Sequence, residues 1–317
     1  MPVSIFFKCQ KCGETLKPKK GDCCIFCSYA DTKCPSPGKC KTHFCYYRYM
    51  PQFLKMPKVQ LALAMLLIAS TAVSHRPTIS TIYVFLLAVG FCILFDLSFL
   101  ALRRTKLFIP YAAIVSGLII GLLTSPLTLW YQIATICALA MAGKNFLRIS
   151  GKHLFNPAGT GLFLAGILFH QSVSWWGVSF QSITTQVSLQ KLFYFSILCF
   201  PFLVSGLRMR RYVSTFSFLI TYSLVSLVFL FHTFSLQTFF ITLFDPTVLF
   251  FSLVMVPEPM TSPVHLKRQI LYGSIIALIV TVLSYPTINS ALSIKEVLPD
   301  PFIAALLASN LIFFRFH

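Results

Sequence analysis

The sequence is poor in charged residues, and above all in acidic ones. Charged side chains make up 11% of its 317 residues and only 8 residues are Asp or Glu, whereas about 25% of the residues of a typical soluble domain are charged. In their place the chain has 56% hydrophobic residues, 33 Phe residues and a mean hydropathy of +0.78. A single soluble core cannot bury so many apolar side chains. The composition therefore excludes a soluble enzyme, a collagen-like fibre and a disordered chain, and predicts an all-α polytopic membrane protein.

Motifs of soluble catalysis are also missing. The sequence contains no Walker loop, no GxGxxG fingerprint, no GxSxG elbow and no HExxH pair, so it offers no recognisable site for nucleotide hydrolysis, hydride transfer or acyl transfer. We also expect no signal peptide before the cysteine-rich region, because the first long apolar run starts at Val59. We therefore expect residues 1–57 to form a separate cytoplasmic head and residues 58–317 to form the membrane domain.

The net charge of +18, from 26 basic and 8 acidic residues, is distributed in a way that indicates a membrane partner. After residue 58 the basic residues lie in short clusters between apolar segments, which is the pattern that orients transmembrane helices. A basic face is also expected beside an anionic inner leaflet. We therefore expect membrane lipids, and no nucleic acid, to be the partners of this charge.

Ten apolar segments follow the head, and each approaches the ~20 residues that a helix needs to cross a hydrocarbon core of ~30 Å. They are residues 59–74, 79–102, 107–124, 127–143, 154–170, 191–207, 212–232, 238–256, 269–284 and 301–316. Several are short, which predicts tilted, broken or re-entrant helices. With the head in the cytoplasm, only Arg76, Lys191 and Lys295 fall in outside loops, and the other twelve Lys and Arg residues beyond residue 58 fall in inside loops. This bias places both termini in the cytoplasm.

Two pairs of proline motifs indicate an internal repeat. Ser-Pro at 125–126 ends the third segment, and Glu-Pro at 258–259 ends the eighth. Asn-Pro at 156–157 begins the fifth segment, and Asp-Pro at 300–301 begins the tenth. Each pair is five segments apart, an odd number, which predicts two inverted five-helix repeats with a binding site at the central breaks. Ordinary helix capping by Asn and Asp is the alternative interpretation.

Eight of the 11 cysteines lie between Cys9 and Cys45 and predict a small metal-stabilised domain. Two CxxC pairs bring four thiolates to one tetrahedral point, which is typical of a zinc ribbon. The ligands of this first site are Cys9, Cys12, Cys24 and Cys27, and those of a second site are Cys23, Cys34, Cys40 and either Cys45 or His43. Metal binding would supply the folding energy that the few apolar residues of the head cannot. An iron or Fe–S centre is one alternative, and disulfides, which a cytoplasmic location disfavours, are the other.

Ionisable groups inside apolar segments are costly and are therefore candidates for an ion pathway. Asp96 and Asp245 are the deepest carboxylates, and Asp245 precedes a proline that predicts a further helix break. Glu258 lies at the predicted end of the eighth segment and is the third candidate. For Asp96, a snorkelling ion pair with the arginines at 103–104 is the alternative.

Basic residues and a histidine lie just before the fifth segment. Lys144, Arg148 and Lys152 recur at intervals of four, so we expect them on one helical face, where they would bind a flavin or lipid phosphate. Membrane topology alone is the alternative explanation of these three charges. His153 adjoins them, and we expect it to have a surface or headgroup role.

Three ordered blocks of the sequence resemble the NqrB/RnfD family, whose members are membrane subunits of sodium-pumping quinone reductases and of Rnf electron-transport complexes. The first block, 144–158, ends in Asn-Pro-Ala. The second, Pro-Glu-Pro-Met-Thr-Ser-Pro at 257–263, lies where the family has Asp-Pro-x-Thr, and a basic-Gly stretch at 267–273 follows it. The third, 298–310, has Leu-Pro-Asp and an apolar helix ending in Asn, where the family has Pro-Asp-Gly and such a helix. The head lies outside the resemblance.

The resemblance implies a ten-helix inverted-repeat domain, in a bacterial-type plasma membrane, that carries FMN or riboflavin and passes electrons through the bilayer. In the family, FMN is linked to a Thr in a Ser-x-Ala-Thr-like stretch after the Asn-Pro-Ala segment. The nearest feature here, with Thr184 and Thr185, departs from that pattern, and a Ser/Thr-rich external loop is the alternative interpretation. Glu258 aligns with the Asp of the family and becomes the carboxylate of a cation site. The other candidates for cofactor binding are Lys152, Asn156, Thr261 and Asp300.

Three functions from different classes fit these observations. The first is a membrane subunit of a flavin-dependent electron-transport complex, with other subunits as partners and cation translocation as a coupled process. The second is a channel or secondary transporter with a central inverted-repeat cavity and a zinc-stabilised regulatory head. The third is a non-catalytic scaffold that docks a soluble partner. Bound flavin or iron favours the first function, zinc together with solute flux favours the second, and the absence of both favours the third.

Overall fold

The computed structural model describes residues 7–8, 15–16, 56–105, 109–149, 151–180, 189–229, 236–284 and 298–314. The chain divides into two units, Met1–Lys55 and Met56–His317. In the first unit, β1 (Phe7–Lys8) pairs with β2 (Thr15–Leu16) in an antiparallel ladder. The eight cysteines of the expected metal sites lie outside the described residues, as do Thr184 and Thr185.

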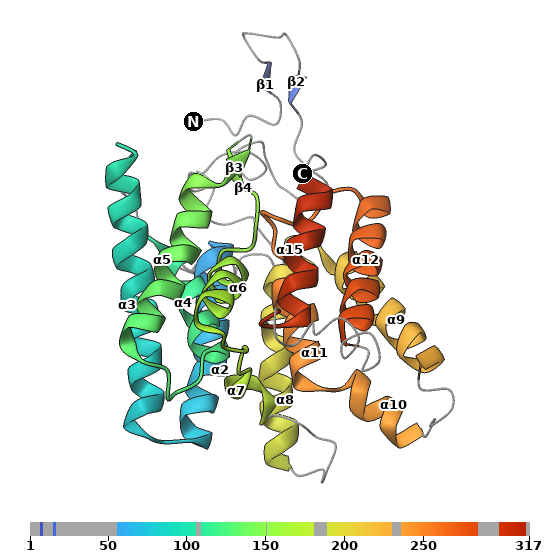
Figure 1. Cartoon of the computed structure of the whole chain (residues 1–317). Helices are drawn as coiled ribbons and strands as arrows, with labels where there is room; N and C mark the ends of the chain where they lie inside the picture. The colour runs from blue at the N-terminus through green and yellow to red at the C-terminus, as the bar shows by residue number, and fades with distance from the viewer. Residues whose placement is uncertain are drawn as a thin grey trace, which may run out of the picture. The chain divides into compact units, whose positions relative to one another are not determined.

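The second unit begins with five apolar helices in chain order (Figure 1). They are α2 (Pro57–His75), α3 (Ile79–Leu102), α4 (Tyr111–Leu123), α5 (Trp130–Phe146) and α6 (Pro157–Phe169). The antiparallel strands β3 (Arg148–Ile149) and β4 (Lys152–His153) connect α5 to α6, and the short helix α7 (Trp176–Ser179) follows α6.

A second series of helices occupies the rest of this unit. They are α8 (Leu189–Phe202), which continues into the π-helix η3 (Leu203–Arg208), α9 (Tyr212–Phe229), α10 (Leu236–Leu243), α11 (Pro246–Phe250), which continues into the π-helix η5 (Phe251–Met255), α12 (Leu266–Ser284) and α15 (Pro301–Phe313). Pro201 precedes η3 by two residues, and proline is a common cause of such irregular turns because it removes a backbone donor. The Ser205 hydroxyl donates to the Pro201 carbonyl over 3.0 Å.

The lengths of these helices support a membrane domain with partly broken spans. Four stretches are long and apolar enough to cross a bilayer, namely Pro57–His75, Ile79–Leu102, Leu189–Arg208 and Leu266–Ser284. Each of the ten apolar segments that the sequence predicts overlaps a helix in the described part of the chain. Helices α4, α6 and α15 have 13 residues each. Each of these helices is therefore only ~20 Å long, which is shorter than the ~30 Å thickness of a hydrocarbon core.

The fourth apolar segment is shifted along the chain relative to the prediction. The sequence predicts residues 127–143, whereas α5 begins at Trp130 and ends at Phe146. The Leu129 amide donates to the Gln132 side chain over 3.2 Å and fixes the later start. As a result Lys144, expected in an inside loop, is a helical residue and is buried in the last turn of α5.

The helices of the two series pack in similar pairs. In the first series α3 packs against α5, α5 against α6, and α2 against α4. In the second series α9 packs against α12, α12 against α15, and α8 against α11.

Glycine residues lie where these helices approach each other most closely. A Cβ atom on Gly273 of α12 would lie 2.3 Å from the carbonyl oxygen of Ser214 in α9, and one on Gly161 of α6 would lie 2.3 Å from that of Ile136 in α5. Small residues of this kind let helices in a membrane approach closely.

We predict that Gly273→Ala lowers the free energy of unfolding by about 1–3 kcal/mol, because the added methyl group overpacks the α9–α12 contact. Gly90→Ala is the matched control, since a Cβ atom on Gly90 meets nothing within 4 Å. Alanine also costs less backbone entropy in a helix, so the control should keep or raise the stability. Thermal unfolding of the purified variants in detergent measures both effects, and equal melting temperatures would contradict this packing.

Candidate functional site

Three polar side chains meet between α3 and α5, inside the first series of helices. Lys144 Nζ lies 2.7 Å from Asp96 Oδ2, and Asn145 Nδ2 donates to Asp96 Oδ1 over 2.8 Å. Asp96 is fully buried, and Lys144 and Asn145 are buried beside it. Both carboxylate oxygens therefore have a donor, and the ammonium group compensates a negative charge that would otherwise be very costly inside an apolar bundle.

The partner of Asp96 differs from the expectation. The sequence suggested a snorkelling pair with Arg103 and Arg104, but both arginines are exposed at the end of α3. The observed partner, Lys144, comes 48 residues later in the chain. The helix register explains the difference, because the shifted end of α5 carries Lys144 into the bundle opposite Asp96.

The three basic residues of the first block do not share a helical face, so that prediction is wrong. Helix α5 ends at Phe146, and Arg148 and Lys152 belong to the β3–β4 ladder. The turn between these strands contains Gly151 at φ +82°, a conformation that favours glycine. Arg148 is exposed and donates to the Gly151 carbonyl, while Lys152 is half-buried.

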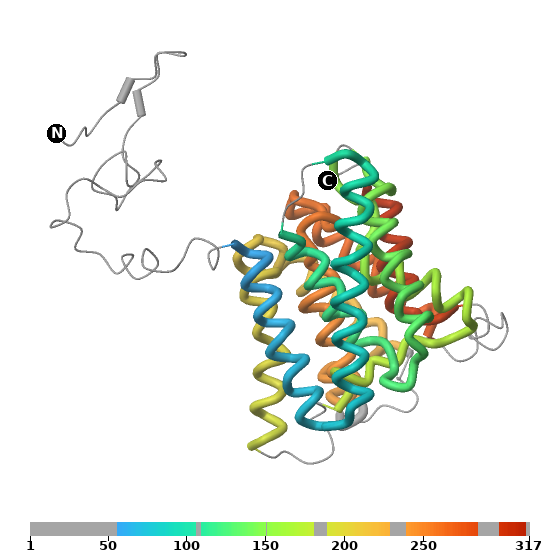
Figure 2. The backbone as a smooth tube through the Cα atoms, turned by 90° about the vertical axis from the view of Figure 1, so that its left-hand side faces the viewer, coloured from blue at the N-terminus to red at the C-terminus, as the bar shows by residue number. Residues whose placement is uncertain are grey.

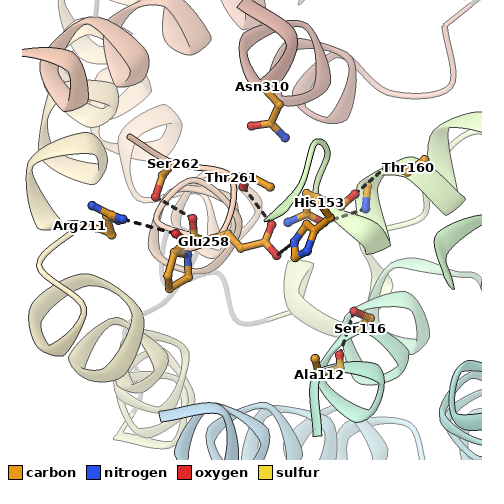
Figure 3. A network of polar contacts seen from close by, with 12 residues as sticks. Ala112, Ser116, His153, Thr160, Arg211, Glu258, Thr261, Ser262 and Asn310 are labelled. Carbon is orange, nitrogen blue, oxygen red and sulfur yellow. Dashed lines mark hydrogen bonds and ion pairs between the residues drawn. The ribbon is translucent and has the colours of Figure 1, made fainter. Parts of the chain in front are cut away.

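A second polar cluster joins the two series of helices (Figure 3). His153 Nε2, at the end of β4, lies 3.2 Å from Glu258 Oε1 in the connection between η5 and α12. The Thr261 hydroxyl donates to Glu258 Oε2 over 3.1 Å, and the Ser262 hydroxyl donates to the Glu258 carbonyl over 2.6 Å. His153 and Thr261 are buried, whereas the Glu258 side chain keeps 21% of its surface exposed. The expected surface role of His153 is therefore wrong, because its ring faces a carboxylate 105 residues away in sequence.

A buried arginine holds the turn that carries Glu258. Arg211, between η3 and α9, donates from Nη1 to the Pro263 carbonyl over 3.0 Å and from Nη2 to the Pro259 carbonyl over 3.4 Å. Burial lowers the pKa of the Arg211 guanidinium from its ordinary value, but an arginine remains protonated at physiological pH. Arg211 thus fixes the two ends of the turn and brings a positive charge to it.

Helix α15 contains two buried polar atoms that the described part of the chain leaves without a partner, and one of them belongs to Asn310 on the Thr261 side of the cluster. Tyr272 of α12 donates to Asn310 Oδ1 over 2.6 Å. Asn310 Nδ2 and the Ser309 hydroxyl are buried, and no described residue bonds to either. Figure 3 shows Asn310 on the same side as Thr261. Buried polar atoms nearly always have a partner, so this position is suited to a ligand or an ordered water.

Proline motifs begin three helices, and a carboxylate or amide caps each of them. Asn156 Oδ1 accepts from the Gly159 amide over 2.9 Å at the start of α6, and Asp300 Oδ1 accepts from the Ile303 amide over 2.9 Å at the start of α15. The half-buried Asp245 caps α11 through the Thr247 amide over 2.8 Å, so the expected break in the eighth segment is present. Capping, the alternative interpretation of Asn156 and Asp300, is therefore what these side chains do.

Helices α6 and α15 run in opposite directions and pack against each other. A Cβ atom on Gly159, in the first turn of α6, would lie 3.6 Å from the Ile303 side chain in the first turn of α15. A Cβ atom on Gly166, near the end of α6, would lie 2.5 Å from Pro299, just before α15. The partly positive N-terminal ends of two short helices thus lie at the contact between the two series.

Both oxygens of the Asp300 carboxylate are engaged by the chain itself. Oδ1 caps α15, and Oδ2 accepts from the Trp175 indole over 2.7 Å. Trp175 has φ +51°, which is uncommon for a bulky residue, and its ring contacts Phe250 and Phe302 at centroid distances of 6.4 and 6.0 Å. Sequence patterns gave no signal for Trp175, because its partner lies 125 residues away.

The comparisons with known proteins bear on both polar clusters. The family model described as the NQR2, RnfD, RnfE family matches residues 53–289. This range includes the Asp96–Lys144 pair and the His153–Glu258 contact, and it ends before α15. The comparison with curated proteins gave no match.

We predict that Lys144→Met lowers the free energy of unfolding by about 3–5 kcal/mol, because it leaves the Asp96 carboxylate buried without a compensating charge. The double variant Asp96→Asn/Lys144→Met removes both charges and should recover most of that loss. Lys267→Met, at an exposed position of α12, is the matched control and should change stability by less than about 0.5 kcal/mol. Unfolding in mixed detergent completes this double-mutant cycle, and additive effects of the two single substitutions would contradict the buried pair.

Proposed function

The chain belongs to the NQR2, RnfD, RnfE family, and we propose that it is a membrane subunit of an electron-transport complex of the Na+-NQR or Rnf type. Members of the family are subunits of multi-subunit complexes, so other subunits are the expected partners, in a bacterial-type inner membrane with both termini in the cytoplasm. The observation that carries the proposal is the family match, which covers both polar clusters. The apolar helices around these clusters support a membrane location.

The proposal includes an inverted repeat of five helices, α2 to α6 in the first half and α8 to α15 in the second. The order of packing supports it, because the second and fourth helices of each half pack together, as do the fourth and fifth. The fifth helices, α6 and α15, also begin alike, with a side chain that caps the amide three residues later and a proline at the next position. In membrane proteins with two inverted halves, matching breaks of this kind mark a binding site between the halves, which supports the proposal.

We propose that the site between the halves holds a flavin, FMN or riboflavin. Such a ring presents carbonyl and nitrogen acceptors, and the buried Asn310 amide, which no described residue bonds, is a donor of the required kind. Of the residues predicted to bind the cofactor, Thr261 bonds to Glu258 and Lys152 directly precedes His153 in the chain, while Asn156 and Asp300 cap the starts of α6 and α15. A flavin bound here would accept and pass on electrons. Covalent attachment through Thr184 or Thr185 stays a prediction about residues outside the described part.

Cation movement is proposed as the coupled process, with Asp96, Asp245 and Glu258 as the pathway carboxylates. Their surroundings support different roles. Lys144 neutralises Asp96, and Asp245 caps a helix, whereas the partly exposed Glu258 is held by His153 and Thr261. Glu258 is thus best suited to meet a cation, and His153 Nε2 is placed to hold or release a proton as the charge of the site changes.

The cysteine-rich head completes the proposal as a zinc-binding domain, with iron or an Fe–S centre as the alternative. Its thiolate ligands would supply either a structural site or a further electron carrier.

A second candidate function is a channel or secondary transporter. The short helices α6 and α15 favour it, because broken helices that meet between two halves are also the architecture of solute sites.

We predict that the full chain, purified from cells replete in flavin and iron, shows flavin absorption bands that bleach on reduction. Thr261→Val removes one hydroxyl from the site and should lower the flavin content about fivefold, the effect of one lost hydrogen bond. Thr135→Val is the matched control on α5, where the hydroxyl only bonds the Tyr131 carbonyl of its own helix.

The absorption spectrum and the metal content of the same samples discriminate the functions. A colourless protein that retains zinc and supports solute flux after reconstitution would contradict electron transport and favour the transporter. Equal flavin contents of the two threonine variants would instead contradict the location of the site, because only Thr261 contacts Glu258.

A further inference from the structure

A groove of about 600 Å³ opens among α2, α3 and α4, and none of its lining residues belongs to either polar cluster. Helix α4 packs against both α2 and α3 and forms the floor through Tyr111, Ile114 and Leu118. The walls are apolar side chains of α2 and α3, among them Leu66 and Leu86. Tyr111 carries the single polar group among the residues that line the groove. Its chemistry therefore suits a hydrocarbon occupant.

A short connection joins α2 and α3, the two helices that form the walls of the groove. Helix α2 ends at His75 and α3 begins at Ile79, so the connection between them has only three residues and keeps these two helix ends close together. Figure 2 shows that the two helices meet at this connection and separate toward the start of α2. All lining residues of α2 come from 59–66, in its first half. The groove is thus a wedge that is open on the membrane side where α2 begins.

The length of the groove favours a flexible chain over a partner helix. On α4 the lining residues extend from Tyr111 to Leu118, a rise of ~10 Å. This is about a third of a hydrocarbon core of ~30 Å, which a transmembrane helix would have to follow from end to end. A lipid acyl chain enters from one leaflet only, and it therefore matches a wedge that ends partway across the membrane.

Basic residues lie at the open end of the groove. Lys58 is exposed and directly precedes Val59, the first residue of α2 that lines the groove. Arg103 and Arg104 are exposed at the end of α3. Because α3 runs antiparallel to α2, its end lies on the same side as the start of α2. From residue 56 to residue 257, the only acidic residues are Asp96 and Asp245. A headgroup at this position would meet positive charge, which attracts anionic lipids.

We propose that this groove binds one acyl chain of an anionic phospholipid, whose headgroup phosphate lies at Lys58 with Arg103 and Arg104 beyond it. The site is separate from the electron-transport proposal, because it requires only that the helices span a bilayer. Gly90 lies in the groove, and a Cβ atom there would meet nothing within 4 Å. The occupant would therefore fill space that the chain itself leaves open.

Photolabelling of the full chain in vesicles tests the groove. The vesicles contain equal parts of phosphatidylglycerol and phosphatidylcholine, with a trace of either lipid carrying a photoreactive acyl chain, and mass spectrometry locates the labelled peptides. We expect the phosphatidylglycerol probe to label α2–α4 more strongly than the phosphatidylcholine probe. Gly90→Leu fills the groove and should abolish this labelling. Ser98→Leu, which adds a side chain at an exposed α3 position outside the groove, should keep it.

A charge variant tests the headgroup independently of the packing. Lys58→Gln should lower labelling by the phosphatidylglycerol probe about fivefold, the contribution of one basic residue at an anionic surface, while Lys267→Gln at an exposed position of α12 should not. Thermal unfolding verifies that each variant is folded, and Lys58 is exposed, so its substitution leaves the core intact. Equal labelling by the two probes, labelling that survives Gly90→Leu, or a polypeptide cross-linked in the groove in native membranes would each overturn the proposal.

Discussion

A charge or a free backbone group inside an apolar bundle must find its partner within the bundle, and the structure of this chain depends on how it meets that requirement. Lys144 and Asn145 saturate the Asp96 carboxylate. Asn156 and Asp300 cap the two short helices α6 and α15. Because hydrocarbon offers no alternative partner, each of these contacts fixes the register of the helices that carry it.

The same requirement locates the proposed site. The short helices α6 and α15 pack against each other at the contact between the two series of helices. The His153–Glu258 contact also joins the two series, and Arg211 holds the turn that carries Glu258. Within the described part of the chain, the buried amide nitrogen of Asn310 in α15 has no partner. A site of this composition suits a redox cofactor and a cation better than it suits acyl or phosphoryl chemistry, for which the sequence has no motif.

Much of this arrangement was predictable from local patterns. Proline after Asn156, Asp245 and Asp300 predicted helix breaks that are present, and the resemblance to the family agrees with the match over residues 53–289. The misplaced residues were those whose environment is set by distant partners. Lys144 and His153 looked like loop and surface groups, because Asp96 and Glu258 lie 48 and 105 residues away. Periodicity also failed at 147–153, where Gly151 turns the chain back as a two-stranded ladder.

The central claim is that a cofactor-binding site lies between the two halves, beside His153, Glu258 and Asn310. An experimental density map of the full chain in lipid, purified with its native ligands, tests it most directly. The account predicts density for a flavin ring within hydrogen-bonding distance of the Asn310 amide. Side-chain density that closes the space and pairs this amide with the protein, or a flavin bound at another position, would contradict it.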